Sequence, residues 1–322
     1  MPVTSVTVRV PAKINLQLAV GPLRPDGYHG LVTVFHAISL FDEVTVAPAG
    51  PDSSGPDSAG PDSGGIDSVT VTGEGAAEVP VTGDNLALRA VRALRDEQRR
   101  RGAVPGAGVA VAISKRIPVA GGMAGGSADA AAALVACNEL WDAGLFPDEL
   151  RQVAAAVGSD VAFAVAGGTA VGRGRGEQLT PVLAAPVRYH WVIALADGQL
   201  STPAVYGALD RMRGAAAVAE PELSAELMSA LRAGDAVRLG AALANDLQAP
   251  AVSLFPALSQ TLSAGRELGA LGALVSGSGP SCYFLARDED QAAELAAALS
   301  GAGAGRAVVR ADGPVPGASV AG

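Results

Sequence analysis

Valine alternates with polar residues over positions 6–10 at the start of the chain, and residues 14–20 continue the alternation. A period of two predicts β-strands with one buried face. Pro25-Asp26-Gly27 then supplies the residues of a turn. The apolar stretches 31–40 and 43–46 on the far side of this turn predict further sheet.

Helical and strand-like patterns follow one another through the rest of the chain. Leu86, Ala90 and Leu94 recur at helical spacing within residues 85–101, whose basic end at 99–101 suits a helix C-terminus. The other expected elements are strands at 109–113, 188–196 and 273–275 and helices at 130–141, 147–157 and 289–299. This mixture has no regular strand–helix–strand repeat, so we expect the α+β class. A proline-bounded stretch at 180–186 places the expected boundary between an N-terminal domain, 1–182, and a C-terminal domain, 183–322.

A low-complexity tract interrupts this pattern at residues 50–64. Gly-Pro-Asp-Ser occurs there three times, starting at Gly50, Gly55 and Gly60. Such a composition cannot bury enough apolar surface to pack. We therefore expect a solvated loop without function, inserted into a hairpin.

Composition limits the classes of function. Of 322 residues, 49% are apolar and 17% are charged, which is typical of a globular protein. The net charge of −9 argues against a nucleic-acid partner, because binding to phosphates needs a basic surface. Two cysteines cannot build a disulfide framework, and no segment has the pattern of a signal peptide or a membrane span. These features predict a soluble, cytoplasmic protein with no membrane partner.

Lysine is rare in this chain. Only Lys13 and Lys115 are lysine among the 23 basic residues, so the other 21 are arginine. A compact, rotatable ammonium serves sites where the planar guanidinium of arginine does not fit. Both lysines therefore become candidate functional residues.

The run from Lys115 to Asp129, KRIPVAGGMAGGSAD, carries the strongest chemical signal. Its four glycines and small neighbours let backbone N–H groups approach an anion closely. Ser127 is expected to cap the helix behind the run, which adds free N–H donors and the positive end of its dipole. We interpret the run as a phosphate-binding loop, since a mere tight turn would not need two pairs of glycines. No lysine follows the last glycine, and neither a G-x-G-x-x-G nor a G-x-S-x-G spacing is present, which excludes the common P-loop, protein-kinase and hydrolase templates.

Residues 118–129 resemble the second motif of the GHMP small-molecule kinases, while residues 11–16 (PAKINL) and 275–282 (VSGSGPSC) resemble the first and third motifs. The resemblance implies a domain like the second domain of ribosomal protein S5, followed by a ferredoxin-like domain. It also implies ATP as donor, with the phosphates on the glycine loop. The residues implied in ATP binding are Asn85, Lys115, Pro118, Val119, Ala120, Gly121, Gly122, Met123, Ala124, Gly125, Gly126, Ser127 and Ala128, and the third-motif loop contributes Gly277, Ser278 and Gly279.

Four further segments, 24–29, 158–161, 167–170 and 172–177, resemble one branch of these kinases. That branch phosphorylates the 2-hydroxyl of a cytidine diphosphate-linked methylerythritol in the non-mevalonate route to isoprenoids. One departure is Ala162, where the branch usually has proline; the neighbouring Asp160 is kept.

The same resemblance implies roles for single residues. Lys13 and Asp160 would form the catalytic pair, Asp160 orienting the acceptor hydroxyl and Lys13 neutralising charge. Tyr28 and Tyr206 would stack on the cytosine and His29 would bind its polar edge, with Asn15 and Thr202 as further substrate contacts. Mg²⁺ is expected with ATP, and Ser127 is the one protein ligand that we expect. His36 and His190, in apolar strand-like surroundings, are expected to be structural.

Two alternatives remain open from the sequence. One is a GHMP kinase for a different acceptor, such as mevalonate or homoserine, which the Asp26–His29 loop disfavours. The other is a non-catalytic RNA-binding module, since part of the implied fold is ribosomal. The acidic net charge and the presence of both Lys13 and Asp160 argue against it.

Overall fold

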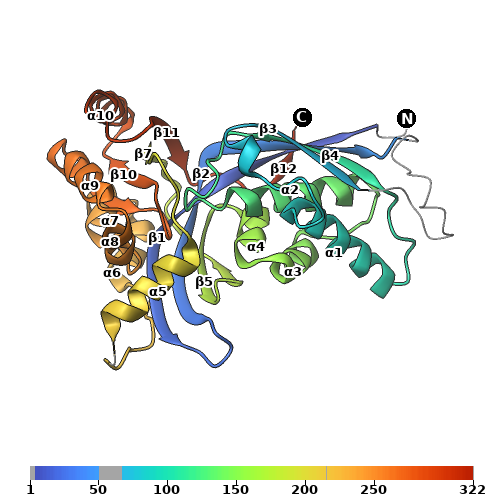
Figure 1. The fold of residues 1–322 in the computed structure, drawn as a ribbon, viewed down its shortest axis with the longest axis horizontal. Coiled ribbons are helices and arrows are strands. Elements are labelled where there is room, and N and C mark those ends of the chain that lie inside the picture. Colours follow the sequence, from blue (N-terminus) through green and yellow to red (C-terminus); the bar gives the residue numbers. More distant parts are fainter. Residues whose placement is uncertain (1–3, 51–66, 215, 322) are drawn as a thin grey trace.

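Two long antiparallel strands, β1 (Val6–Leu23) and β2 (His29–Pro48), run through most of the length of the molecule (Figure 1). The computed structural model describes residues 4–50, 67–214 and 216–321. The expected stretches 6–10 and 14–20 both belong to β1, and the expected stretches 31–40 and 43–46 both belong to β2. Register shifts after Pro11, Asn15 and Val20 bend β1. Residues 10–18 are buried on both faces of β1, which is why the alternation seen at positions 6–10 fades there.

The first sheet has the order β12-β1-β2-β4-β3. β4 (Val109–Lys115) is antiparallel to β2 and parallel to β3 (Ser68–Gly73), and β12 (Ser319–Val320) returns from the C-terminus to pair with β1. β5 (Thr169–Gly174) pairs with β2 and with β6 (Gln178–Pro181), and the short β8 (Ala244–Asn245) pairs with β1. The expectation of a hairpin around the tract 50–64 is wrong, because β4 lies between β2 and β3. All of this tract except Gly50 lies outside the described residues, so its nature stays a prediction.

Helices cover one face of this sheet, as Figure 1 shows. They are α1 (Leu86–Arg100), α2 (Gly125–Leu140), α3 (Pro147–Val157) and α4 (Ser159–Ala166), with a short 3-10 turn, η2 (Ala76–Glu78), before them. α2 is the central helix, and six of its 16 residues are alanine, so it packs closely against β1, β2, α1 and α4. The helix expected at 147–157 is confirmed to the residue. Within the described residues, no helix is both long and apolar enough to cross a membrane.

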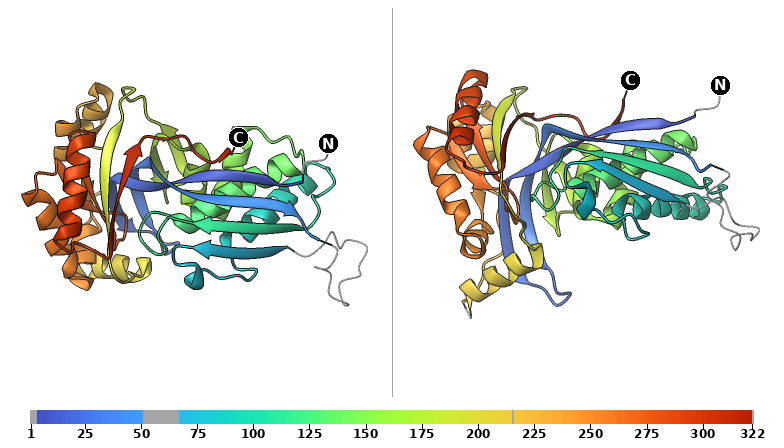
Figure 2. Two further views of the ribbon diagram at one scale, coloured as in Figure 1. Left: turned by 90° about the horizontal axis from the view of Figure 1, so that it is seen from above. Right: turned by 45° about the horizontal axis from the view of Figure 1, so that its top comes forward.

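The second sheet has the order β11-β7-β10-β9, all antiparallel (Figure 2). Its strands are β7 (Tyr189–Leu195), β9 (Gly272–Val275), β10 (Cys282–Ala286) and β11 (Ala307–Gly313), and helices α5 (Thr202–Arg213), α6 (Ala225–Ala233), α7 (Ala236–Ala242), α8 (Gln248–Leu254), α9 (Ala257–Glu267) and α10 (Glu289–Gly301) connect or cover them. This strand order, together with α10 between β10 and β11 in the chain, is that of a ferredoxin-like domain, as expected.

Both faces of β10 are covered. Phe284 on β10 packs with α9 and α10, whereas Tyr283 faces the first sheet. β10 is thus buried on both faces and shows no alternation, so periodicity along the chain does not predict this strand.

The two sheets meet around His36. Its ring lies edge-on to Trp191 and Tyr189, with centroids 5.6 and 6.0 Å away, and its Nδ1 is 2.8 Å from Thr169 Oγ1. The side chain is completely buried, and burial lowers the pKa of His36 from 6.5 to about 3; the nearby Gly313 backbone acts in the opposite direction without cancelling the effect. His36 therefore has a structural position at the joint between the sheets.

This burial makes stability depend on pH in a defined direction. Between pH 6.5 and about pH 3 the unfolded chain protonates His36 while the folded chain does not. The free energy of unfolding should therefore fall as the pH drops below 6.5, by up to about 1.4 kcal/mol per pH unit from this group. Melting temperatures of the parent and His36→Gln between pH 7 and pH 4.5 test this. The variant should show the shallower decline, and parallel declines would contradict the assignment.

Candidate active site

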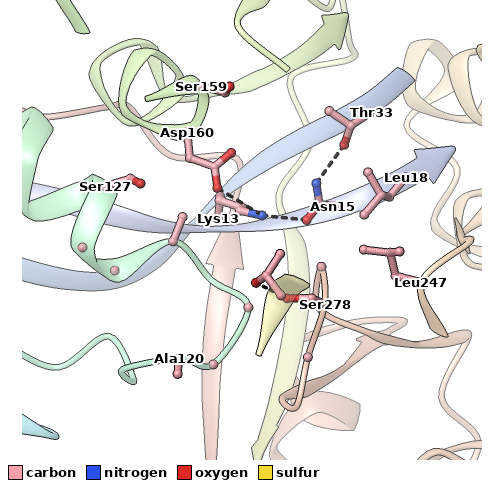
Figure 3. Close-up of a pocket in the computed structure, with 18 of the residues that line it drawn as sticks. Lys13, Asn15, Leu18, Thr33, Ala120, Ser127, Ser159, Asp160, Leu247 and Ser278 are labelled. Atoms are coloured by element: carbon pink, nitrogen blue, oxygen red, sulfur yellow. Dashed lines mark hydrogen bonds and ion pairs between the residues drawn. The ribbon is translucent and has the colours of Figure 1, made fainter. Parts of the chain in front are cut away.

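A cavity of about 520 Å³ lies where the three sequence motifs, residues 11–16, 118–129 and 275–282, meet. β1 contributes Lys13 and Asn15, the glycine loop contributes seven residues between Ala120 and Ser127 together with Pro118 before it, and the loop before β10 contributes the third motif. Figure 3 shows these segments around the opening, with α4 bringing Ser159 and Asp160 to the opposite side. Of the expected site residues, this cavity is lined by Lys13, Asn15, Pro118, Ala120, Gly121, Gly122, Ala124, Gly125, Gly126, Ser127, Asp160, Thr202, Tyr206, Gly277, Ser278 and Gly279.

Lys13 is held in place by a chain of hydrogen bonds (Figure 3). Its Nζ donates to Asn15 Oδ1 at 2.8 Å, and Asn15 Nδ2 donates to Thr33 Oγ1 at 2.8 Å. Lys13 Nζ lies 3.7 Å from Asp160 Oδ2, and the Asp160 side chain is one-third exposed towards the cavity. Because both polar ends of Asn15 have protein partners, Asn15 fixes the direction of the Lys13 ammonium. The arrangement leaves a carboxylate and an ammonium side by side at a solvent-accessible cavity wall.

The glycine loop leads directly into α2. Ala120, Gly122 and Ala124 have positive φ values of 53°, 76° and 59°, which folds the loop tightly without long side chains. α2 begins at Gly125, after Ala124, so the expectation that Ser127 caps the helix is wrong: Ser127 lies in the first helical turn. The first N–H in this helix with a backbone partner is that of Ala128, which donates to Ala124 O at 2.9 Å. The preceding N–H groups and the positive end of the dipole suit an anion such as a phosphate.

The third-motif loop packs against the glycine loop. Ser276 Oγ donates to Gly122 O at 3.0 Å, and Ser278 Oγ lies 2.8 Å from Thr202 Oγ1 on α5. Gly277 has a φ of 54°, and a Cβ built on it would lie 3.6 Å from Lys13 Nζ and 3.5 Å from Asn15 Oδ1. The absence of a side chain at Gly277 thus keeps space beside the ammonium of Lys13.

Several residues expected at ATP lie away from the cavity. Asn85 is buried and serves as the N-cap of α1, accepting from Ala87 N at 2.9 Å and donating to Pro80 O at 2.7 Å. The Lys115 side chain is buried between two aspartates, and the Met123 side chain points into the core. Val119 and Ala128 do not line the cavity either. Local sequence could not show this, because Asp42, one of the two partners of Lys115, is 73 residues away in the chain.

A second cavity, of about 830 Å³, adjoins the first and is lined by the tip of the β1–β2 hairpin, α5, and the end of α3. It contains Tyr28, His29, Thr202 and Tyr206. Tyr28 is 55% exposed, but His29 is buried, stacks on Tyr206 at 5.2 Å, and pairs through Nε2 with Asp210 Oδ1 at 2.9 Å. The Tyr206 ring therefore already has an aromatic partner in this structure, unlike the expected pair of tyrosines enclosing a base.

Arg175 and Asp210 are site residues that the sequence alone does not predict. Arg175 lines both cavities, and its guanidinium lies 5.0 Å from the centre of the Tyr28 ring. No carboxylate pairs with this guanidinium in the part of the chain that the structure describes. The repeated Gly-Arg-Gly at 172–176 was a visible signal, but only the fold shows that it reaches the cavity wall.

No group of three or more metal-ligating His, Cys, Asp or Glu side chains occurs among the described residues. The oxygens at the cavity, from Ser127 and Asp160, are hard ligands suited to Mg²⁺, which commonly keeps waters and takes most other ligands from substrate phosphates. The residues present therefore fit a magnesium ion that is brought by ATP.

This fold and site define a GHMP kinase. The family model of the GHMP kinase N-terminal domain matches residues 85–168, and that of the C-terminal domain matches residues 227–305. A homoserine kinase from Cytophaga hutchinsonii has the same fold, with a TM-score of 0.73, 18% identity, and coverage of 100% of this chain and 98% of that one.

Closer relatives narrow the class. The 4-diphosphocytidyl-2-C-methyl-D-erythritol kinase of Thermobifida fusca is 56% identical over 98% of both chains, and that of Mycobacterium tuberculosis (strain ATCC 25177 / H37Ra) is 50% identical over 99% of this chain and 94% of the relative. A crystal structure of 4-(cytidine 5'-diphospho)-2C-methyl-D-erythritol kinase matches with a TM-score of 0.71 and 32% identity, covering 95% of this chain and 98% of that one. The chain belongs to the 4-diphosphocytidyl-2-C-methyl-D-erythritol kinase family and is a small-molecule kinase. The expected α+β class is confirmed. The expected resemblance to the branch of GHMP kinases that acts on a cytidine diphosphate-linked methylerythritol is confirmed as well.

Proposed function

We propose that this kinase transfers the γ-phosphoryl group of ATP to the 2-hydroxyl of 4-diphosphocytidyl-2-C-methyl-D-erythritol, giving ADP and the 2-phosphate. The observation that carries the proposal is the pair of adjoining cavities. The smaller holds the glycine loop and the Lys13–Asp160 pair, and the larger holds Tyr28 and His29. They share Leu31, Ser159, Arg175, Thr202 and Tyr206, so one acceptor can reach from the larger cavity into the smaller.

The donor phosphates fit the glycine loop. A Cβ at Gly126 would lie no closer than 3.5 Å to another part of the protein, at Leu86 on the wall of the smaller cavity. The free N–H groups of the first turn of α2 point out of this end of the helix. α4 also begins at the cavity, with Ser159 and Asp160 in its first turn. Two helix N-termini therefore favour negative charge at the place proposed for the transferred phosphoryl group.

Asp160 accepts a hydrogen bond from the acceptor hydroxyl and orients that oxygen towards the γ-phosphorus. Lys13, fixed by Asn15, neutralises negative charge that builds up on the transferring group. A loose phosphoryl-transfer transition state needs position and charge neutralisation more than proton removal. When Mg²⁺ is bound with ATP it supplies further neutralisation, and Ser127 and Asp160 are the side chains that would hold it.

The acceptor cavity suits a nucleotide-linked alcohol. Tyr28 offers an exposed ring for stacking on a base. The Arg175 guanidinium beside it, which pairs with no carboxylate of the described residues, offers a charge for a diphosphate. Asp210 holds His29 by its Nε2 and leaves Nδ1 for a hydrogen bond to the polar edge of the base. Along the two cavities, Tyr28, Arg175 and Asp160 thus lie in the same order as the base, the diphosphate and the alcohol of the proposed acceptor.

A coupled assay of ADP release across a panel of acceptors tests the proposal. The cytidine diphosphate-linked methylerythritol should be used with the highest kcat/KM, ahead of its uridine analogue, mevalonate and homoserine. Preference for mevalonate or homoserine would contradict the proposed acceptor and assign a different one. Salt-dependent RNA binding without ADP release from any acceptor would support the non-catalytic alternative.

Replacing Tyr28 tests the acceptor side alone. Tyr28→Ala should raise KM for the cytidine acceptor about tenfold, as expected for the loss of one stacking contact, while KM for ATP stays within twofold. Phe146→Ala is the matched control, because Phe146 is also an exposed aromatic ring but lies outside both cavities. A raised KM for ATP with an unchanged acceptor KM would place Tyr28 at the donor instead.

A further inference from the structure

Lys115, the second of the two lysines, lies at the end of β4 and does not reach either cavity. Its Nζ lies 2.5 Å from Asp42 Oδ2 on β2 and 2.7 Å from Asp129 Oδ2 on α2. The three side chains are 1%, 0% and 3% exposed, respectively. Burial acts to lower the pKa of Lys115, but the two carboxylates outweigh it and hold the pKa above its usual value, so the ammonium stays charged.

Asp42 also holds the start of the glycine loop. Its Oδ1 accepts from the backbone N–H of Arg116 at 2.5 Å and of Ile117 at 2.8 Å, while its Oδ2 accepts from Lys115. Asp42 therefore joins β2 to the two residues through which the chain leaves β4 and enters the loop.

Asp129 holds the other end of the loop. It lies on α2, four residues after Gly125, and a Cβ built on Gly125 would be 3.3 Å from Lys115 Nζ. The ammonium is thus directly beneath the point where the loop becomes a helix. Through Asp42 and Asp129, this single side chain links the entry and the exit of the loop.

Stability alone is a poor explanation for this cluster. Burying ionised groups costs desolvation energy, and well-packed apolar residues of similar size are often as stabilising. Asp129 Oδ1 is also buried without a hydrogen-bond partner among the described residues, which adds to the cost. What the cluster supplies, and apolar residues cannot, is directional bonds that fix the loop backbone relative to β2 and α2.

We propose that Asp42, Lys115 and Asp129 form a positioning brace for the glycine loop, through which the Lys115 side chain acts on the donor phosphates without itself contacting ATP. This replaces the expected direct contact between Lys115 and the nucleoside. The inference rests on the proposed function in one respect, that the donor phosphates bind this loop. The brace sets where the N–H groups of the loop lie, and misplacement of such groups by about 1 Å can cost about a hundredfold in rate.

Lys115→Met is the primary test, because methionine keeps most of the length of the side chain and removes the ammonium. KM for ATP should rise about tenfold or more, with KM for the acceptor within twofold. In the protein without ligands, amide hydrogen exchange over residues 116–126 should become faster. A residue that only contacts the nucleoside would leave this exchange unchanged, which would overturn the proposal.

A double variant separates position from stability. Burial raises the pKa of Asp129 to about 8 even with Lys115 beside it, and Lys115→Met removes this cation, so the buried carboxyl must take up a proton or stay charged at a cost in stability. Adding Asp129→Asn removes the titrating group, so the double variant should regain part of the melting temperature. KM for ATP should remain raised in the double variant, because the link across the loop is still missing. Recovery of the original KM for ATP would show that the cluster only stabilises the fold.

Arg95→Met is the matched control. Arg95 is a mostly buried cation paired with Asp67, with side chains 12% and 15% exposed, and neither residue lines the cavities. Its loss should lower the melting temperature without changing KM for ATP. An equal rise in KM for ATP in Arg95→Met would overturn a specific role of the brace. Failure of the proposed function is distinguishable, because the unmodified kinase would then release no ADP with the cytidine acceptor.

Discussion

Asp160→Asn is expected to lower kcat by about a hundredfold or more while the affinity for ATP, measured by calorimetry, stays within a few-fold. The asparagine keeps the shape but loses the negative charge that orients the acceptor hydroxyl, an interaction needed at the transferring group. Lys13→Met should have an effect of similar size. In that variant the cavity loses the ammonium 3.7 Å from Asp160, and Asn15 loses its hydrogen-bond donor.

Asp148→Asn is the control for this pair. Asp148 also lies in the first turn of a helix, α3, but it is exposed and outside both cavities, so kcat should not change. Circular dichroism should show that all three variants are folded. If Asp160→Asn kept a kcat close to that of the parent, Asp160 would have no role in the reaction.

Gly126→Val should abolish measurable ATP binding in calorimetry. The site of its Cβ has no neighbour closer than 3.5 Å, so the fold can accept the side chain, but the branches would fill the space proposed for a phosphate. They would also cover the N–H groups at the start of α2. We therefore expect loss of activity with a native circular dichroism spectrum.

Gly301→Val is the corresponding control, because Gly301 ends α10 and a Cβ there meets nothing within 4 Å. Gly122 is unsuitable for this test: its Cβ would lie 2.0 Å from Ser276 O, so a substitution would disrupt the fold itself. If Gly126→Val binds ATP as the parent does, the loop is a structural turn.

Local sequence determined the elements whose pattern is set by one exposed face. The alternation over positions 6–10 and the helix Pro147–Val157, with its proline start and glycine end, are of this kind. The glycine run also predicts a phosphate-binding loop, because two pairs of glycines next to a helix have few other uses, and the structure places it at the cavity and at the start of α2. The resemblance of three motifs indicated the family, and relatives that are 56% and 50% identical over nearly the whole chain confirm it.

Only the tertiary structure decided what each polar side chain contacts. Lys115 looked like a ligand of ATP, but the fold places Asp42, 73 residues away in sequence, within hydrogen-bond distance of its ammonium. His29 closely follows the predicted turn at Pro25-Asp26-Gly27, yet Asp210, 181 residues away, holds it in a buried position. β10 was missed for the same reason that these pairs were. Burial on both faces and pairing across long separations depend on how elements pack together, and periodicity along the chain reports only the exposure of one element at a time.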